Sequence, residues 1–258
     1  MTSGTNPRMP SILGGPVIIL DQPQLGENIG TVARAMLNCG LTSLRLVSPR
    51  DGWPNERALG PASGATSVLD GVRVYPSLKE AIADLNYVVA TTARPRDMAK
   101  EILTPKGAAK ALRKKTAAGD ACGIIFGCER TGLTSDNLPL ADAIVSVPLN
   151  PAFSSLNLAQ SVLILAYEWF QSGSDIPESQ LHTGKSEVAS KAQLQALFDR
   201  LEGELDEAGF FTSAEQKPSM QRNMRNMLQR ARLTAQETNT FQGIISALTG
   251  KRKPAGNA

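Results

Sequence analysis

Three short stretches of the chain combine glycine with amide, carboxylate or guanidinium side chains. The first is Gly26-Glu27-Asn28-Ile29-Gly30, which continues to Arg34; the second is Ile124–Leu133, which contains Glu129; the third is Val147–Asn157. Glycine lets the backbone approach a flat ligand closely, and the polar groups donate and accept hydrogen bonds. These residue types predict three loops that contact a ligand.

Several kinds of chemistry are disfavoured by what the chain lacks. Its single histidine, His182, lies in a polar stretch, and Cys39, Cys122 and Cys128 have no metal-ligand spacing. We therefore expect no metal site and no histidine-dependent nucleophile. A nucleotide-binding oxidoreductase is opposed because the chain has no G-x-G-x-x-G fingerprint.

The composition and the first residues of the chain indicate in which compartment the protein is expected. The hydrophobic content is 41% and the charged content 20%, which is typical of a globular protein. Residues Met1–Ile12 lack the charged and apolar regions of a secretory signal, and no apolar run is long enough to span a bilayer. The three cysteines are expected to be buried small side chains in a reducing compartment. We expect a cytoplasmic protein with no membrane contact.

The motifs must be positioned by strands and helices, which the hydrophobic pattern predicts. Apolar runs of strand length are Val17–Leu20, Leu44–Val47, Tyr87–Ala90, Gly123–Phe126 and Ile144–Val147. Helical patterns cover Glu27–Asn38, Ser77–Leu85, Gly107–Lys115 and Ser155–Phe170. Buried strands that alternate with helices predict an α/β fold with a mostly parallel sheet covered on both faces. Ser154 or Ser155 would serve as the N-cap of the last of these helices.

The pattern changes after residue 170. Residues 171–187 are polar and resemble a linker. Beyond them, a helical stripe of leucine and phenylalanine over 194–205 is followed by helices over Met220–Leu233 and Glu237–Leu248. We therefore expect one domain over residues 1–170, a linker over 171–187 and a small all-helical domain over 188–258.

Basic residues strongly outnumber acidic residues near the end of the chain. Between positions 217 and 253, Glu237 is the single acid, and the bases are Lys217, Arg222, Arg225, Arg230, Arg232, Lys251, Arg252 and Lys253. Such a segment fits binding to a phosphate backbone. On charge alone, a solvated helical face that aids solubility is an equally good interpretation.

In order and spacing, the three motifs resemble those of the SpoU/TrmH branch of the SPOUT RNA methyltransferases. The family signature N-x-G-x-x-x-R is matched from Asn28 to Arg34, F-G-x-E-x-x-G-L by Phe126–Leu133, and the proline-containing stretch that ends in S-L-N by Pro148–Asn157. Residues Asn150–Ala159 and the helical extension resemble one subgroup in particular. Members of that subgroup methylate the ribose 2′-hydroxyl of cytidine or uridine at position thirty-two, in the tRNA anticodon loop.

The resemblance implies a fold and a cofactor that periodicity does not give. The C-terminal part of the sheet would form a trefoil knot, and the knot loops would hold S-adenosylmethionine. The protein would be a homodimer with active sites completed across the interface. Matched residue by residue, the cofactor pocket would be lined by Thr91, Thr92, Ala93, Gly127, Val147, Ser154, Ser155 and Leu156.

The resemblance also implies which residues act in catalysis. Arg34 matches the arginine sometimes proposed as the base in this family. A guanidinium is always protonated and has no acceptor, so we favour Arg34 as a stabiliser of the developing alkoxide, with an RNA phosphate or water taking the proton. Asn28 and Asn157 would orient the ribose or Arg34. Glu129 would position Arg34 or Asn28, and Ser155 would hold substrate or cofactor.

The helical extension would supply affinity for tRNA. Arg222, Arg225, Arg230 and Arg232 are expected to contact the tRNA backbone, while Met224, Met227 and Leu228 are expected to pack internally.

Two alternatives stay open. The first is a SPOUT 2′-O-methyltransferase that acts on rRNA or on another tRNA position, because the motifs recognise cofactor and ribose rather than a particular RNA. The second is a non-catalytic RNA-binding homologue, although all three motifs keep their polar residues.

Overall fold

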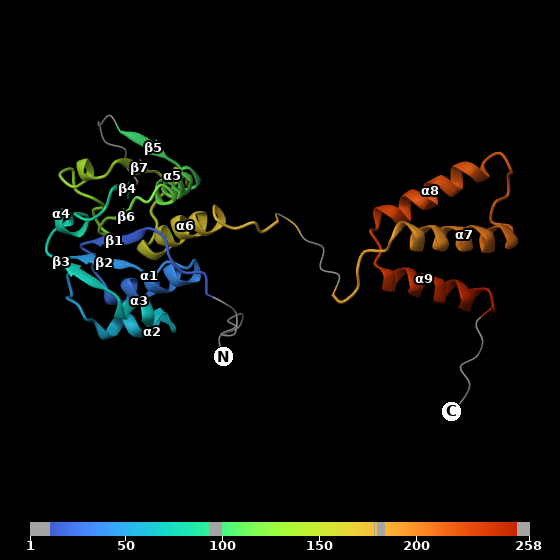
Figure 1. Cartoon of the computed structure of the whole chain (residues 1–258), viewed down its shortest axis with the longest axis horizontal. Helices are drawn as coiled ribbons and strands as arrows, with labels where there is room; N and C mark the ends of the chain where they lie inside the picture. Colours follow the sequence, from blue (N-terminus) through green and yellow to red (C-terminus); the bar gives the residue numbers. More distant parts are fainter. Residues whose placement is uncertain (1–10, 93–99, 178, 180–183, 252–258) are drawn as a thin grey trace, which may run out of the picture. The chain divides into compact units, whose positions relative to one another are not determined.

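The computed structural model describes residues 11–92, 100–177, 179 and 184–251. It divides the chain into two compact units, Met1–Ile176 and Pro177–Ala258 (Figure 1). Among the described residues, no helix is both long and apolar enough to cross a membrane.

The first unit is built on a sheet of parallel strands in the order β3-β2-β1-β6-β4-β7-β5. The strands are β1 Val17–Asp21, β2 Leu44–Val47, β3 Arg73–Tyr75, β4 Tyr87–Thr91, β5 Glu101–Leu103, β6 Cys122–Phe126 and β7 Ala143–Val145. Every residue of the central strand β6 is buried, which explains its unbroken apolar run. The expected parallel sheet is therefore confirmed. The edge strands β3 and β5 were not predicted because each is short and carries polar or exposed residues.

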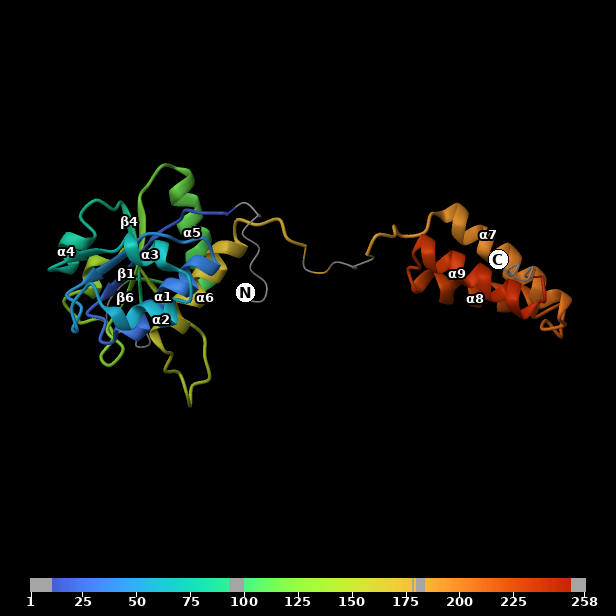
Figure 2. The same ribbon diagram turned by 90° about the horizontal axis from the view of Figure 1, so that it is seen from below.

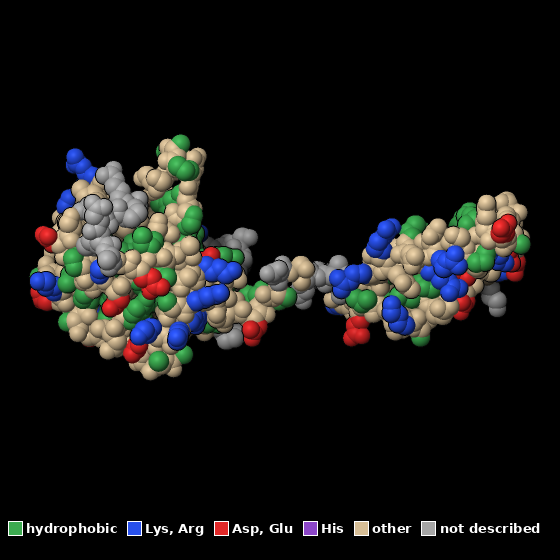
Figure 3. Space-filling model, turned by 90° about the horizontal axis from the view of Figure 1, so that it is seen from above, with side chains coloured by type: hydrophobic (Ala, Val, Ile, Leu, Met, Phe, Trp, Pro, Cys, Tyr) green, Lys and Arg blue, Asp and Glu red, His purple; other side chains and the backbone are tan. Residues whose placement is uncertain are grey.

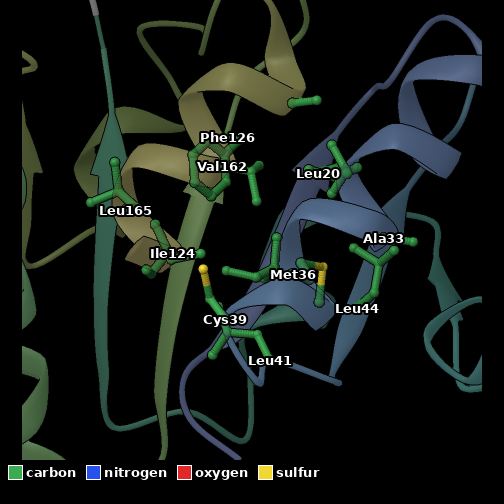
Figure 4. Close-up of a cluster of buried hydrophobic side chains, with 14 of the residues drawn as sticks. Leu20, Ala33, Met36, Cys39, Leu41, Leu44, Ile124, Phe126, Val162 and Leu165 are labelled. Carbon is green, nitrogen blue, oxygen red and sulfur yellow. The ribbon is translucent and has the colours of Figure 1, made fainter. Parts of the chain in front are cut away.

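Helices cover both faces of this sheet. They are α1 Gly26–Asn38, α2 Leu59–Ala62, α3 Thr66–Asp70, α4 Leu78–Ala81, α5 Pro105–Ala117 and α6 Leu158–Gln171, with short 3-10 turns η1 Glu56–Ala58 and η2 Leu138–Leu140. Side chains alternate between the faces of each strand, so Ile18 and Leu20 join the core under α1, α5 and α6, while Ile19 joins the core under α4. Figure 4 shows part of the first core, in which Val162 of α6 lies beside Phe126 of β6 and Met36 of α1 belongs to the same cluster.

Three boundaries differ from the sequence prediction. The helix predicted over 77–85 is only the single turn α4, and strand β7 ends at Val145, so that Val147 lies in the following loop. Helix α6 begins at Leu158, and its N-cap is Asn157 rather than Ser154 or Ser155. The Asn157 Oδ1 atom accepts from the Ala159 N–H at 2.8 Å, and the Gln160 Oε1 atom accepts from the Asn157 N–H at 3.0 Å. This reciprocal capping box satisfies two donors that the serines leave unmet.

The second unit contains three helices within residues 184–251. They are α7 Lys191–Glu207, α8 Lys217–Arg230 and α9 Ala235–Leu248. Their core is separate from that of the sheet and consists of Ala189, Leu194, Leu197, Phe198, Leu228, Leu233 and Ile245. Ser190 and Thr234 cap α7 and α9, each with a capping box that fixes where its helix begins.

Candidate functional site

The three polar motifs meet because the strands are parallel. The carboxyl ends of parallel strands lie at one edge of a sheet, and ligands of open α/β sheets bind there. Strand β1 leads at this edge into α1, β6 leads into the loop that carries Glu129, and β7 leads into the loop 146–157. The loop 146–157 projects from the first unit (Figure 2).

One chain of hydrogen bonds joins the three motifs. Asn28 Nδ2 donates to Glu129 Oε1 at 2.9 Å, and Asn157 Nδ2 donates to Asn28 Oδ1 at 3.3 Å. The orientation of each amide is determined by its second contact. The Asn157 oxygen is used as the cap of α6, so its NH₂ group faces Asn28. The Asn28 NH₂ group in turn faces the carboxylate.

A further residue of this network, Gln24, was not predicted from the sequence. Its backbone N–H donates to Glu129 Oε2 at 3.1 Å, and its Nε2 atom lies 3.3 Å from the Cys128 sulfur. A backbone donor leaves no signature in residue type, so nothing in the motif could have indicated it. Cys128 is half-buried in this contact, whereas Cys39 and Cys122 are buried as expected.

Glycine gives the loop of Glu129 its shape. A Cβ atom on Gly127 would lie 2.3 Å from the Leu133 nitrogen, so only glycine lets the chain return this closely on itself. The Gly132 N–H closes the turn by donating to the Cys128 carbonyl at 2.8 Å, and Gly132 adopts a φ of 67°. The Glu129 carboxylate is thus carried by a turn that this hydrogen bond closes.

Gly30, in the first motif, has a packing role instead. A Cβ atom there would lie 2.0 Å from the carbonyl oxygen of Ala58, at the end of η1. The glycine therefore allows α1 to pack directly on the η1–α2 segment, and the motif's spacing needs no bound phosphate to explain it.

Arg34 is not part of the hydrogen-bond chain. It lies on the exposed face of α1, and within the described part of the molecule its guanidinium has no hydrogen bond, ion pair or ring contact. The structure therefore brings Asn28, Glu129 and Asn157 together and leaves Arg34 free to contact a ligand.

The residues expected to hold a cofactor lie along the same edge. Thr91 ends β4 and donates from Oγ1 to the Ile125 carbonyl at 3.2 Å, while the Thr92 N–H donates to the Val145 carbonyl at 3.1 Å. In the loop that follows β7, Val147 is half-buried against the core. Further along it, Ser154 and Ser155 are exposed, and Leu156 is half-buried. Ala93 lies outside the described residues.

A buried carboxyl group, Asp21, lies at the carboxyl end of β1, close to this edge of the sheet. It is 4% exposed at the end of β1, and Asn137 Nδ2 donates to its Oδ2 atom at 2.9 Å. Burial raises the pKa of Asp21, and the hydrogen bond from Asn137 offsets part of that effect. This hydrogen bond joins Asn137, directly before η2, to Asp21 of the strand β1 in the middle of the sheet.

The four arginines of the second unit are not equivalent. Arg222, Arg230 and Arg232 are exposed, whereas Arg225 is bound to the buried Glu202, with Nη2 at 2.7 Å from Oε2. Arg225 thereby joins α8 to α7. Leu228 is buried as expected, but Met227 is 55% exposed, so its expected internal packing is wrong.

Comparison with known proteins agrees with the motif order. Residues 15–167 match the model of the SpoU rRNA Methylase family, and this span includes all three motifs. The chain belongs to the SpoU methylase family. Residues 192–257 match a second model, the C-terminal domain of the tRNA methyltransferase TrmJ.

Curated relatives of this SpoU family member extend over nearly its whole length. A tRNA (cytidine/uridine-2′-O-)-methyltransferase TrmJ of Pectobacterium atrosepticum is 36% identical over 90% of this chain and 95% of its own. A tRNA (cytidine/uridine/adenosine-2′-O-)-methyltransferase TrmJ of Pseudomonas aeruginosa is 33% identical over 85% and 88%. The crystal structure of TrmJ from Z. mobilis ZM4 has 44% identity and a TM-score of 0.78, covering 92% of this chain and all of that one.

Proposed function

We propose that this SpoU family member transfers a methyl group from S-adenosylmethionine to the ribose 2′-hydroxyl of a tRNA. The observation that carries this proposal is the chain from Glu129 through Asn28 to Asn157, which joins all three family motifs at the carboxyl edge of the sheet. The relatives that match nearly the whole chain are named as tRNA 2′-O-methyltransferases, which favours tRNA over rRNA.

The residues at the sheet edge fit S-adenosylmethionine. The cofactor presents a flat base, ribose hydroxyls and an amino acid end, so it needs apolar surface, backbone groups and hydroxyls but no phosphate cradle. Val147 and Leu156 offer half-buried apolar surface, Gly127 offers backbone, and Thr91, Thr92, Ser154 and Ser155 offer hydroxyl groups. These residues, together with Ala93, would hold the cofactor, which supplies a methyl group activated by its positive sulfur.

This chain's own residues would position the ribose and stabilise charge. Asn28 and Asn157 are held in fixed orientations and would direct the 2′-hydroxyl, which matters because a displacement needs an aligned oxygen. Glu129 acts by positioning Asn28, and Ser155 contacts substrate or cofactor. The free guanidinium of Arg34 would stabilise the alkoxide that develops as the proton leaves to an RNA phosphate or water.

The knot and the dimer belong to the same proposal. Strand β7 lies between β4 and β5 in the sheet, so these two strands are consecutive along the chain but are not neighbours in the sheet. We propose that this C-terminal part of the sheet forms the trefoil knot that the family resemblance implies. The homodimer would complete each site, and the exposed Arg34 is suited to act there because it has no partner within the described part of its own chain.

The helical unit would provide affinity for tRNA. We propose residues 1–170 as the methyltransferase domain, 171–187 as the linker and 188–258 as the RNA-binding extension in the cytoplasm. Arg222, Arg230 and Arg232 are exposed and free to contact phosphates, while Arg225 would contribute chiefly by holding α8 on α7. The subgroup resemblance points to a cytidine or uridine at position thirty-two.

A labelled-methyl assay tests the proposal and its alternatives. The protein is incubated with labelled S-adenosylmethionine and either bulk tRNA or rRNA, and the methylated nucleotide is then mapped. Label at position thirty-two of tRNA is the expected result. Label in rRNA or at another tRNA position would support the first alternative. Binding of RNA without any label would support the non-catalytic homologue.

A further inference from the structure

Helix α5, which no motif includes, is unusually basic. It contains no acidic residue, and its basic residues are Lys106, Lys110, Arg113, Lys114 and Lys115. Two of these have internal partners. Arg113 stacks on Trp169 at 3.6 Å from the ring centroid and donates to the Trp169 carbonyl, and Lys115 pairs with Asp120 at 3.5 Å.

The other three lysines form an exposed stripe. Lys106, Lys110 and Lys114 are spaced four residues apart and therefore lie on one face of the helix. Among the residues that the structure describes, none of the three side-chain ammonium groups has an ion pair or a hydrogen bond. Figure 3, viewed from the side on which α5 lies in Figure 1, shows basic side chains in a row on the first unit.

This arrangement opposes helix stability. Like charges four residues apart repel, and Lys106 stands in the first turn, where the helix dipole disfavours a cation. Lys114 stands in the last turn, where the dipole favours a cation, but no described acid lies within ion-pair distance of the stripe to offset the repulsion among the three lysines. A charge pattern that the folded chain does not use is suited to an external anion.

The position of α5 connects the stripe with the candidate site. The helix begins directly after β5, at the carboxyl edge where the three motifs meet, and runs beside α6 toward the opposite edge, where β6 begins. Lys106 is therefore the residue of the stripe nearest the motifs. From Lys106 to Lys114 the stripe extends for roughly 12 Å along the helix. Its apolar side, Ala108, Ala109 and Leu112, is fully used against the core, which leaves no apolar face to enter a lipid surface.

We propose that Lys106, Lys110 and Lys114 bind the phosphate backbone of the RNA substrate on the first unit, along a line that leads from the edge of the site. This inference rests on the proposed function and adds a second electrostatic contact, separate from the arginines of the helical unit. The stripe contacts phosphates only, so it contributes affinity and orientation but no choice of base.

The test measures binding of the full-length protein to fluorescently labelled tRNA over a range of salt concentrations. In the variant Lys106→Gln/Lys110→Gln/Lys114→Gln, we expect the slope of log K against log salt to become shallower by about 2 and low-salt affinity to fall about tenfold or more. The corresponding triple arginine variant should keep the original affinity. The matched control is Lys115→Gln, because Lys115 lies on the same helix but is paired with Asp120. Each phosphate contact that is lost makes the slope shallower by roughly one, so we expect the control to change it by less than about half that amount.

Separate readouts distinguish the possible outcomes. The triple glutamine variant should keep its Tm and its affinity for S-adenosylmethionine, which excludes misfolding. An unchanged slope in a folded variant would overturn the inference, as would preferential binding of the unaltered protein to vesicles of anionic phospholipid. If the unaltered protein transfers no methyl group but the variant loses its salt-dependent binding, the proposed function fails while the stripe stands.

Discussion

At the scale of single residues, Arg34 and Asn28 differ in what holds their side chains. Asn28 is fixed by Glu129 and Asn157, whereas Arg34 has no described partner. Removal of Arg34 should therefore leave the fold intact. The same is not expected for Asn28, because its loss would leave the Gln24 backbone N–H as the one described donor to the Glu129 carboxylate.

The variant Arg34→Ala is expected to lose methyl transfer while it keeps its cofactor. Removal of one stabiliser of a developing negative charge lowers kcat by about 10²–10³-fold in comparable sites. Affinity for S-adenosylmethionine, measured by calorimetry, and Tm should be near those of the unaltered protein. Full turnover in this variant would exclude Arg34 from the chemistry.

Asp21 predicts a pH-dependent effect on stability. Burial raises the pKa of Asp21 in the folded chain, so the folded state binds a proton more tightly than the unfolded state does. The free energy of unfolding therefore falls as the pH rises from the ordinary aspartate pKa through the raised pKa of the folded state. The variant Asp21→Asn should therefore have a higher Tm than the unaltered protein at pH 7. The difference should shrink as the pH falls below the ordinary aspartate pKa, where Asp21 is neutral in both states.

Thermal melts at pH 7 and near pH 4 check this expectation. The exposed Asp136 provides the control, because Asp136→Asn removes the same charge from a side chain that is not buried. A lower Tm for Asp21→Asn at pH 7 would show that the charged carboxylate stabilises the native fold.

At the scale of elements, residue types alone identified the strands that form the buried centre of the sheet. They did not identify β3 and β5, because three-residue edge strands with exposed side chains have no apolar period. Within the site, Asn28, Glu129 and Asn157 were predicted as ligand-contacting residues, but their mutual contacts depend on strand order. The N-cap was misassigned because Ser155 and Asn157 are equally good capping residues, and the Gln160 side chain decides between them.

The arginines of α8 give a paired prediction at this scale. Arg225→Ala should lower the Tm of the helical unit, because Glu202 is 6% exposed and loses its bidentate partner. Arg222→Ala should leave Tm unchanged and reduce the salt dependence of tRNA binding by about one in log–log slope. Circular dichroism and binding titrations separate the two effects. Equal Tm values for the two variants would contradict this division of roles.

At the scale of the whole molecule, the two units have separate cores, and this separation predicts separate losses. Leu197 is fully buried in the helical core, so Leu197→Ala should destabilise that unit by about 2–5 kcal/mol. We expect the first unit to bind S-adenosylmethionine normally in this variant, while KM for tRNA rises. Loss of cofactor binding, measured by calorimetry, would show that the sheet unit depends on the helical one.

In the proposed reaction, the methyl group is transferred to a ribose 2′-oxygen of tRNA. Alkaline hydrolysis of the labelled product tests it most directly, because cleavage requires a free 2′-hydroxyl. We expect label from S-adenosylmethionine to be recovered in one alkali-resistant dinucleotide, and its rate of formation to fall by about 10²–10³-fold in Arg34→Ala. Label released entirely in single nucleotides would place the methyl group on a base and contradict 2′-O-methylation.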